Sequence, residues 1–210
     1  MTETVITVQG TFSKLYPAER ADATISVAHE GPARADTIAA VTASSDSVRA
    51  AIDASTVDRW SADRLQTWDE KPWSSDGAQL ALVFHARIGF AVRFSDFDAL
   101  SSWLASVTEI PGVTIDALEW GLTDSTRTAA TAEVRSRAVK DAVAKASVYA
   151  QSIGLGSVSA TALADPGMLG VGAPPPEMRM MKAAADISQL SLKPADIEIA
   201  ATVDARFVAS

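Results

Sequence analysis

The chain has 210 residues and a formal net charge of −8, and it contains no cysteine. The lack of cysteine excludes disulfide bonds, thiolate catalysis and Cys-ligated zinc. The negative charge opposes binding to DNA or RNA, whose phosphates the average surface field repels, so we expect no nucleic-acid partner. The N-terminal residues show no pattern typical of a signal peptide, and no apolar run reaches the length of about 20 residues that a membrane span needs. We therefore expect a cytoplasmic protein without a membrane span.

Apolar periodicity in the first quarter of the chain predicts two strands followed by a helix. Residues 5–8 form a short apolar run, and residues 21–28 alternate between apolar and polar side chains, which is typical of a half-buried strand. These two strands can pair through a connection over residues 10–20. A helix is predicted to begin near Pro32, because mostly apolar side chains recur at steps of three and four over residues 38–52.

The clearest pattern in the chain is a long alternating segment over residues 80–94. Apolar side chains occupy every second position of this segment. The alternation predicts one long strand, curved or bulged, with Gly89 as the bend. A weaker strand is predicted over residues 57–68, and the proline and glycine of residues 69–77 predict the turn between the two strands.

The C-terminal half is predicted to contain two helices and three strands. The first helix is capped by Ser95 or Asp96 and ends at Pro111-Gly112, while the second is the longest of the chain and is followed by Gly154, which suits the left-handed position after a helix end. The predicted elements are a helix over 97–107, a strand over 113–122, a helix over 126–153, and strands over 157–163 and 197–207.

Residues 166–194 differ from the rest of the chain because they show no clear apolar period. They include three consecutive prolines and the methionines Met178, Met180 and Met181. About thirty residues without secondary structure are unusual inside a compact domain, so we predict a mobile or interaction loop. Methionine forms adaptable surfaces, so the loop could contact a partner peptide or a neighbouring subunit, or it could be poorly ordered.

The order of these elements indicates an α+β fold with mixed, largely antiparallel sheets and three main helices. A chain of this length fits a single domain over residues 1–210. Two closely packed α/β subdomains, over about 1–95 and 96–210, are the alternative organisation.

Residues 6–27, 132–155 and 192–199 form three stretches that resemble the SIMPL (DUF541) family. Residues 6–27 are similar to the family's opening, a strand that ends in Gly, a Pro-containing element and an alternating strand, although the element at Pro17–Ala21 lacks the family's Asp. Residues 132–155 resemble its Ala/Lys/Arg-rich helical segment. Residues 192–199 resemble its Pro-Gly-x-Ile-x-Val strand, with Ala195 in place of Gly.

The resemblance covers nearly the whole chain and rests on structural elements. It implies a SIMPL-like fold. Members of the family are commonly exported, include immunogenic proteins of the bacterial periplasm and outer membrane, and can assemble into rings. The family carries no general enzymatic activity. The resemblance therefore implies an assembly protein rather than an enzyme.

Three tryptophans and one histidine are the candidate binding residues. Trp60, Trp68 and Trp73 cluster around the predicted hairpin, where they indicate a stacking platform for a ligand, core packing or a subunit interface. His85 lies on the less apolar face of the long strand, and catalysis or metal binding there would need convergent partners that the spacing does not supply. We therefore predict no catalytic residue, no cofactor and no metal site.

Three hypotheses for function remain open from the sequence. The leading one is a non-enzymatic assembly or interaction protein that forms a homo-oligomer, with a further, unidentified protein partner. Its expected contacts are the strand over 80–94, the tryptophan hairpin and the methionine-containing loop. The first alternative is a small-ligand binding module with a pocket near the three tryptophans, and the second is a hydrolase that uses His85 with a nearby carboxylate.

Overall fold

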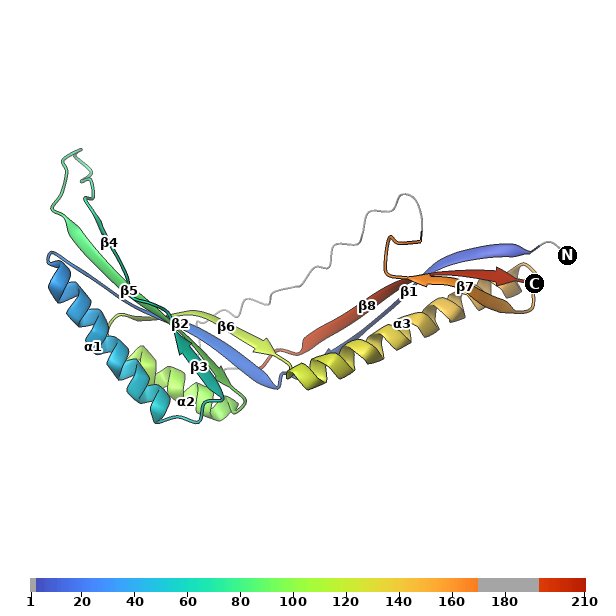
Figure 1. Ribbon diagram of the computed structural model, residues 1–210, viewed down its shortest axis with the longest axis horizontal. Helices are drawn as coiled ribbons and strands as arrows, with labels where there is room; N and C mark the ends of the chain where they lie inside the picture. The colour runs from blue at the N-terminus through green and yellow to red at the C-terminus, as the bar shows by residue number, and fades with distance from the viewer. Residues whose placement is uncertain (1–2, 170–192) are drawn as a thin grey trace. The chain divides into compact units, whose positions relative to one another are not determined.

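The computed structural model describes residues 3–169 and 193–210, whose contacts divide them into two compact units (Figure 1). Within the described residues, three helices and antiparallel sheets confirm the predicted α+β fold. The two units interleave along the sequence, so their boundaries differ from a division near residue 95. Unit 1 comprises residues 3–17, 122–169 and 196–210, and unit 2 comprises residues 18–121 and 193–195.

Unit 1 is a three-stranded antiparallel sheet with one long helix packed on it. The strands lie in the order β1-β8-β7. The prediction that the first strand is short and pairs with the strand over 21–28 is wrong, because β1 pairs with β8 along its whole length. The N-terminal strand therefore belongs with the C-terminal part of the chain. The elements of unit 1 are β1 (Thr4–Tyr16), α3 (Asp124–Ser152), β7 (Val158–Ala164) and β8 (Ile197–Ala209).

The buried face of α3 is a row of small side chains that lets the helix approach the sheet closely. Most positions of this row are alanine, at a spacing of four residues. At Gly10 of β1, an added Cβ would lie 2.7 Å from the Cβ of Ala142 and would overlap the backbone oxygen of Ala138. Glycine at this position is therefore required by the contact with α3. The buried residues of the row are Ala130, Val134, Ala138, Ala142, Ala146 and Ala150.

Side chains of α3 also cover the outer edge of β1. The Asp141 carboxylate accepts a hydrogen bond from the backbone N–H of Thr11 at 2.8 Å, and the Lys145 ammonium donates to the backbone oxygen of Gln9 at 3.0 Å. The ion pair with Lys145 and the bond from Thr11 lower the pKa of Asp141. Exposed edge strands attract other chains, so this cover opposes strand addition at the middle of β1.

Near the C-terminal end of β1, the Glu133 carboxylate accepts hydrogen bonds from Lys14 and Tyr16, which lower its pKa from the ordinary value of 4.5. A carboxyl with a lowered pKa in the folded state stabilises the fold above its unfolded pKa, and this contribution is lost as pH falls through the folded pKa. Glu133→Gln is therefore expected to make stability less dependent on pH below about pH 4.5. Urea unfolding at several acidic pH values measures the change. An unchanged acid dependence would contradict the expectation.

Unit 2 is a five-stranded antiparallel sheet with both of its helices on one face (Figure 1). The strands lie in the order β3-β5-β2-β6, and β4 also pairs with β5. The core between the sheet and the helices includes Ile25, Phe90, Phe94 and Trp103, which are almost fully buried. The elements are β2 (Arg20–Gly31), α1 (Arg34–Asp53), β3 (Arg59–Ala62), β4 (Gln66–Glu70), β5 (Val83–Phe94), α2 (Phe97–Thr108) and β6 (Val113–Gly121).

The long strand predicted over 80–94 is β5, which begins at Val83. It pairs with β2 without interruption from Ala21↔Phe94 to Gly31↔Phe84, so the register shows no bulge at Gly89. A Cβ at Gly89 would lie 2.6 Å from the Asp63 carboxylate, so the glycine leaves room for that side chain. The weaker strand predicted over 57–68 is divided into β3 and β4, which both pair with β5.

Two polar groups in the core of unit 2, the Ser45 hydroxyl and the Trp103 indole N–H, have no hydrogen-bond partner among the described residues. The Oγ of Ser45 on α1 is fully buried and unpaired. Ser45→Ala is expected to raise the free energy of unfolding by about 1 kcal/mol, because it removes a desolvated hydroxyl and favours the helix. Thermal and urea unfolding measure this change.

The matched control is Ser47→Ala on the exposed side of the same helix, where the hydroxyl donates to the Ala43 oxygen at 3.2 Å. Both variants gain the same helix propensity, so the difference between them reports the buried hydroxyl. Equal effects of the two substitutions would show that Ser45 carries no such penalty.

Most of the loop predicted over 166–194 lies outside the described residues, and so do Met178, Met180 and Met181. Its described beginning is bound to β8. The backbone N–H of Gly167 donates to the Asp204 carboxylate at 2.7 Å, and the Arg206 guanidinium donates to the Leu169 oxygen at 3.0 Å.

Candidate functional site

The face of the unit 2 sheet that carries no helix is lined by charged pairs. Every second residue of β5, from Ala86 to Phe94, is buried on the helix-covered face, so the intervening side chains project from the open face. Arg93 of β5 makes two hydrogen bonds to Asp22 of β2, at 2.7 and 3.2 Å. Arg87 bonds the Asp116 carboxylate of β6 at 3.0 Å. Opposite charges thus meet on this face both between the neighbouring strands β5 and β2 and, across β2, between β5 and β6.

The next position along β5 on this face is His85, which contacts three neighbouring side chains. Register places it directly opposite Glu30 of β2 and Trp68 of β4. The imidazole stacks on the Trp68 indole, with 5.0 Å between ring centroids and 5° between planes. Its Nδ1 lies 3.5 Å from a Glu30 oxygen, and its Nε2 lies 3.3 Å from a Glu70 oxygen. The His85 side chain is only 15% exposed, so these neighbours enclose most of it.

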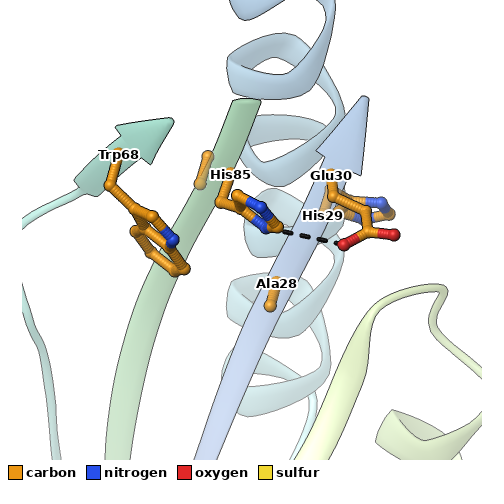
Figure 2. A pocket seen from close by; sticks show the side chains of 6 residues that line it. Ala28, His29, Glu30, Trp68 and His85 are labelled. Atoms are coloured by element: carbon orange, nitrogen blue, oxygen red, sulfur yellow. Dashed lines mark ion pairs between the residues drawn. The ribbon is translucent and has the colours of Figure 1, made fainter. Parts of the chain in front are cut away.

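Figure 2 shows the hollow that His85, Trp68 and Glu30 border. Its volume is about 240 Å³, and the small side chain of Ala28 lies on β2 beside the contact between His85 and Glu30. His29 also borders the hollow, but its ring is held by a contact of 2.9 Å between Nε2 and the Ser44 hydroxyl of α1. We call the group of Ala28, Glu30, Trp68, Glu70 and His85 the His85 site.

The structure does not gather the three tryptophans around one pocket. Trp68 belongs to the His85 site, whereas Trp60 of β3 is paired with Val92 and lies 6.5 Å from the Phe90 ring. Trp60 borders a separate hollow of about 200 Å³ with the Asp22–Arg93 pair. Trp73 lies beyond β4, bridges to Gln79 and is 68% exposed.

Large apolar side chains are exposed immediately before β4, on β4 and in its connection to β5. The exposed fractions are 39% for Leu65, 45% for Trp68, 68% for Trp73 and 48% for Leu80. Figure 1 shows this hairpin extending past the end of α1. The connection is held by backbone hydrogen bonds from Leu80 N–H to Pro72 and from Ser74 N–H to Ala78, both 2.8 Å long. We call Leu65, Trp68, Trp73 and Leu80 the hairpin surface.

Two residues of the His85 site, Glu30 and Glu70, were not among the sequence-predicted candidates. They follow from the pairing of β5 with β2 and β4, which places them beside His85. The only sequence signal for Glu30 is its position near the end of an alternating strand. Among the described residues, no group of three or more His, Asp or Glu side chains is placed to hold a metal ion.

No helix within the described parts of the chain combines the length and apolar character needed to cross a membrane. The sequence model of the SIMPL family, described as a protein of unknown function (DUF541), matches residues 6–207. Comparison with curated proteins found no match. The family match covers both units and every strand and helix described above, apart from the outer ends of β1 and β8.

Proposed function

Because the chain belongs to the SIMPL (DUF541) family, whose function is unknown, we propose its role from its surface: it is a non-enzymatic assembly protein that associates with itself and with a protein partner through the hairpin surface. The observation that carries this proposal is the exposure of two tryptophans and two leucines on one projecting hairpin. Tryptophan is enriched at protein interfaces and at their energetic centres.

The local structure of the hairpin supports binding at low entropic cost. Trp68 is held by its stack on His85, and the residues around Trp73 are fixed by the bridge to Gln79 and the backbone bonds of the connection. Side chains that are already ordered lose less freedom when they bind a partner. The hairpin therefore presents apolar groups that are both exposed and positioned.

Sedimentation velocity over a range of micromolar concentrations tests the proposal. The expected result is a weight-average sedimentation coefficient that rises with concentration. A single monomeric species over the whole range would remove self-association from the proposal. Co-purification from a lysate with the wild-type chain, compared with a chain in which the hairpin surface is altered, then tests the partner.

The second candidate function is a small-ligand binding module at the His85 site. The hollow of about 240 Å³ beside the Trp68–His85 stack favours it. Tryptophan fluorescence titrated with a metabolite panel, with Trp68→Phe as the reference variant, tests this candidate. A ligand that changes the emission of the wild type but not of Trp68→Phe would support it, and an unchanged emission for the whole panel would count against it.

The third candidate function is a hydrolase that uses His85. Glu30 and Glu70 supply the carboxylates that it requires beside His85. An activated nucleophile would be needed as well, because a His–carboxylate pair supplies only the base and its orientation. His85→Ala should abolish any hydrolysis that depends on this site.

A further inference from the structure

Elsewhere on the open face, the carboxylates of Asp22 and Asp116 each lie beside at least one arginine. Asp22 is paired with Arg93 and Arg20, and Asp116 is paired with Arg87. At His85, one imidazole meets two carboxylates, those of Glu30 and Glu70. Both glutamates are largely exposed, at 73% and 58% of their side chains. This end of the face therefore carries an excess of negative charge that is accessible from outside.

Hydrogen-bond counting at His85 leads to the same conclusion. Each ring nitrogen faces a carboxylate oxygen, and an imidazole supplies at most two N–H donors to the four oxygens of Glu30 and Glu70. The buried Nε2 makes no hydrogen bond to the described residues. The His85 site thus offers more acceptors than its own donors can satisfy, and a cationic donor would correct this.

The hollow has the size and the walls that suit a guanidinium group. Its volume of about 240 Å³ exceeds the roughly 150 Å³ of an engineered cavity that holds benzene. A guanidinium ion is planar, stacks on indole rings and bonds carboxylates through two parallel N–H groups. The hollow supplies the half-exposed Trp68 indole and the Glu30 carboxylate.

The same hairpin already holds an arginine in this manner. Arg34 lies over the Phe84 ring, 5.5 Å from its centroid, and donates a hydrogen bond to the Asp69 carboxylate at 3.1 Å. On the helix-covered face of the hairpin, an aromatic ring and a carboxylate thus hold an arginine side chain. The His85 site on the opposite face presents an aromatic ring and a carboxylate on β4 and β2, on either side of β5, without a guanidinium among the described contacts.

We propose that the hollow of the His85 site receives an arginine side chain of the partner protein, whose guanidinium bonds Glu30 and packs on Trp68. Glu70 adds to the negative field that favours the cation. The proposal rests on the proposed function, because the hairpin surface would bring the partner to this position. The inference adds that the partner presents an arginine side chain at the contact.

NMR titration of the ¹⁵N-labelled full chain with blocked tripeptides tests the proposal. The probes are acetyl-Gly-Arg-Gly-amide, its lysine and citrulline counterparts, and free L-arginine. The arginine peptide is expected to shift the Trp68 indole N–H and the Ala28 and Glu30 amides saturably. Citrulline has a similar shape without the charge and should bind at least about tenfold more weakly. The lysine peptide lacks the planar guanidinium group, so its affinity should lie between those of the arginine and citrulline peptides.

Two variants of the site separate charge from shape. Glu30→Gln removes the carboxylate, and Ala28→Ile fills the hollow on an exposed strand position where β-branched residues are well tolerated. Each is expected to weaken binding of the arginine peptide at least about tenfold. Glu198→Gln on β8 of unit 1 makes the same change of charge away from the site and should leave binding unchanged. Amide spectra of each variant verify that it is folded.

Several results would overturn the proposal. These are equal binding of the citrulline and arginine peptides, no shift at Trp68, or full binding by a folded Ala28→Ile variant. Free arginine that binds more tightly than the blocked peptide would assign the hollow to a small molecule instead of a protein. If hairpin variants lose association but the chain does not bind the arginine peptide, only this inference is rejected. If the chain binds the arginine peptide but its association does not depend on the hairpin surface, only the proposed function is rejected.

Discussion

Gly10→Ala is expected to destabilise unit 1 by about 3 kcal/mol, the upper part of the range for overpacked cores. The added methyl group would overlap the Ala138 oxygen and lie 2.7 Å from the Ala142 Cβ, so either α3 or β1 must move. Backbone atoms of a helix cannot give way as a flexible side chain can. Urea unfolding measures the loss, and hydrogen exchange should locate it in β1, β8 and α3, with the amides of β2 and β5 less affected.

Gly156→Ala is the matched control for this prediction. A Cβ at Gly156 would lie 3.6 Å from the Ser210 oxygen, which is an ordinary contact. The expected effect of this substitution is within about 0.5 kcal/mol. If Gly10→Ala proved no more destabilising than Gly156→Ala, the close approach of α3 to β1 would be refuted.

The double variant Trp73→Ser/Leu80→Ser is expected to weaken self-association about 100-fold, which corresponds to roughly 3 kcal/mol. Both side chains are exposed, at 68% and 48%, and neither belongs to the core of unit 2. The variant should therefore keep the stability of the wild type. Sedimentation equilibrium gives the association constants of both proteins.

The control for this prediction is Leu163→Ser/Met168→Ser in unit 1. These side chains are similarly exposed, at 54% and 75%, but lie outside the hairpin surface. Self-association of the control should match that of the wild type. A control that dissociates as readily as the hairpin variant would show that general surface hydrophobicity drives association.

Local sequence patterns were sufficient to predict the three helices and the long alternating strand of unit 2. The periods of α1, α2 and α3 arise within each segment, and Asp96 caps α2 by accepting hydrogen bonds from the N–H groups of Asp98 and Ala99. The pairing of β1 with β8 joins opposite ends of the chain, and no local period identifies such a partner. Gly10 interrupts the apolar pattern of β1, because contact with α3 excludes a side chain there, so the pattern predicted too short a strand.

The candidate site could also be predicted only in part from local sequence patterns. Trp68 and His85 were predicted as candidates and are stacked in the structure. Trp60 and Trp68 project from opposite faces because β3 and β4 pair with β5 in registers that differ by one residue. A shift of one residue moves a side chain to the other face of a sheet. Spacing along the sequence could not reveal this shift, nor could it place Glu30 and Glu70 beside His85.

Hydroxyl-radical footprinting of the assembled and the dilute chain tests the role of the hairpin surface most directly. The account predicts that the oxidation rates of Trp68 and Trp73 fall when the chain associates, because both indoles become buried at the contact. Met168 in unit 1, which is 75% exposed, should oxidise at the same rate in both states. An assembled form in which Trp73 remains as reactive as in the monomer would contradict the proposal.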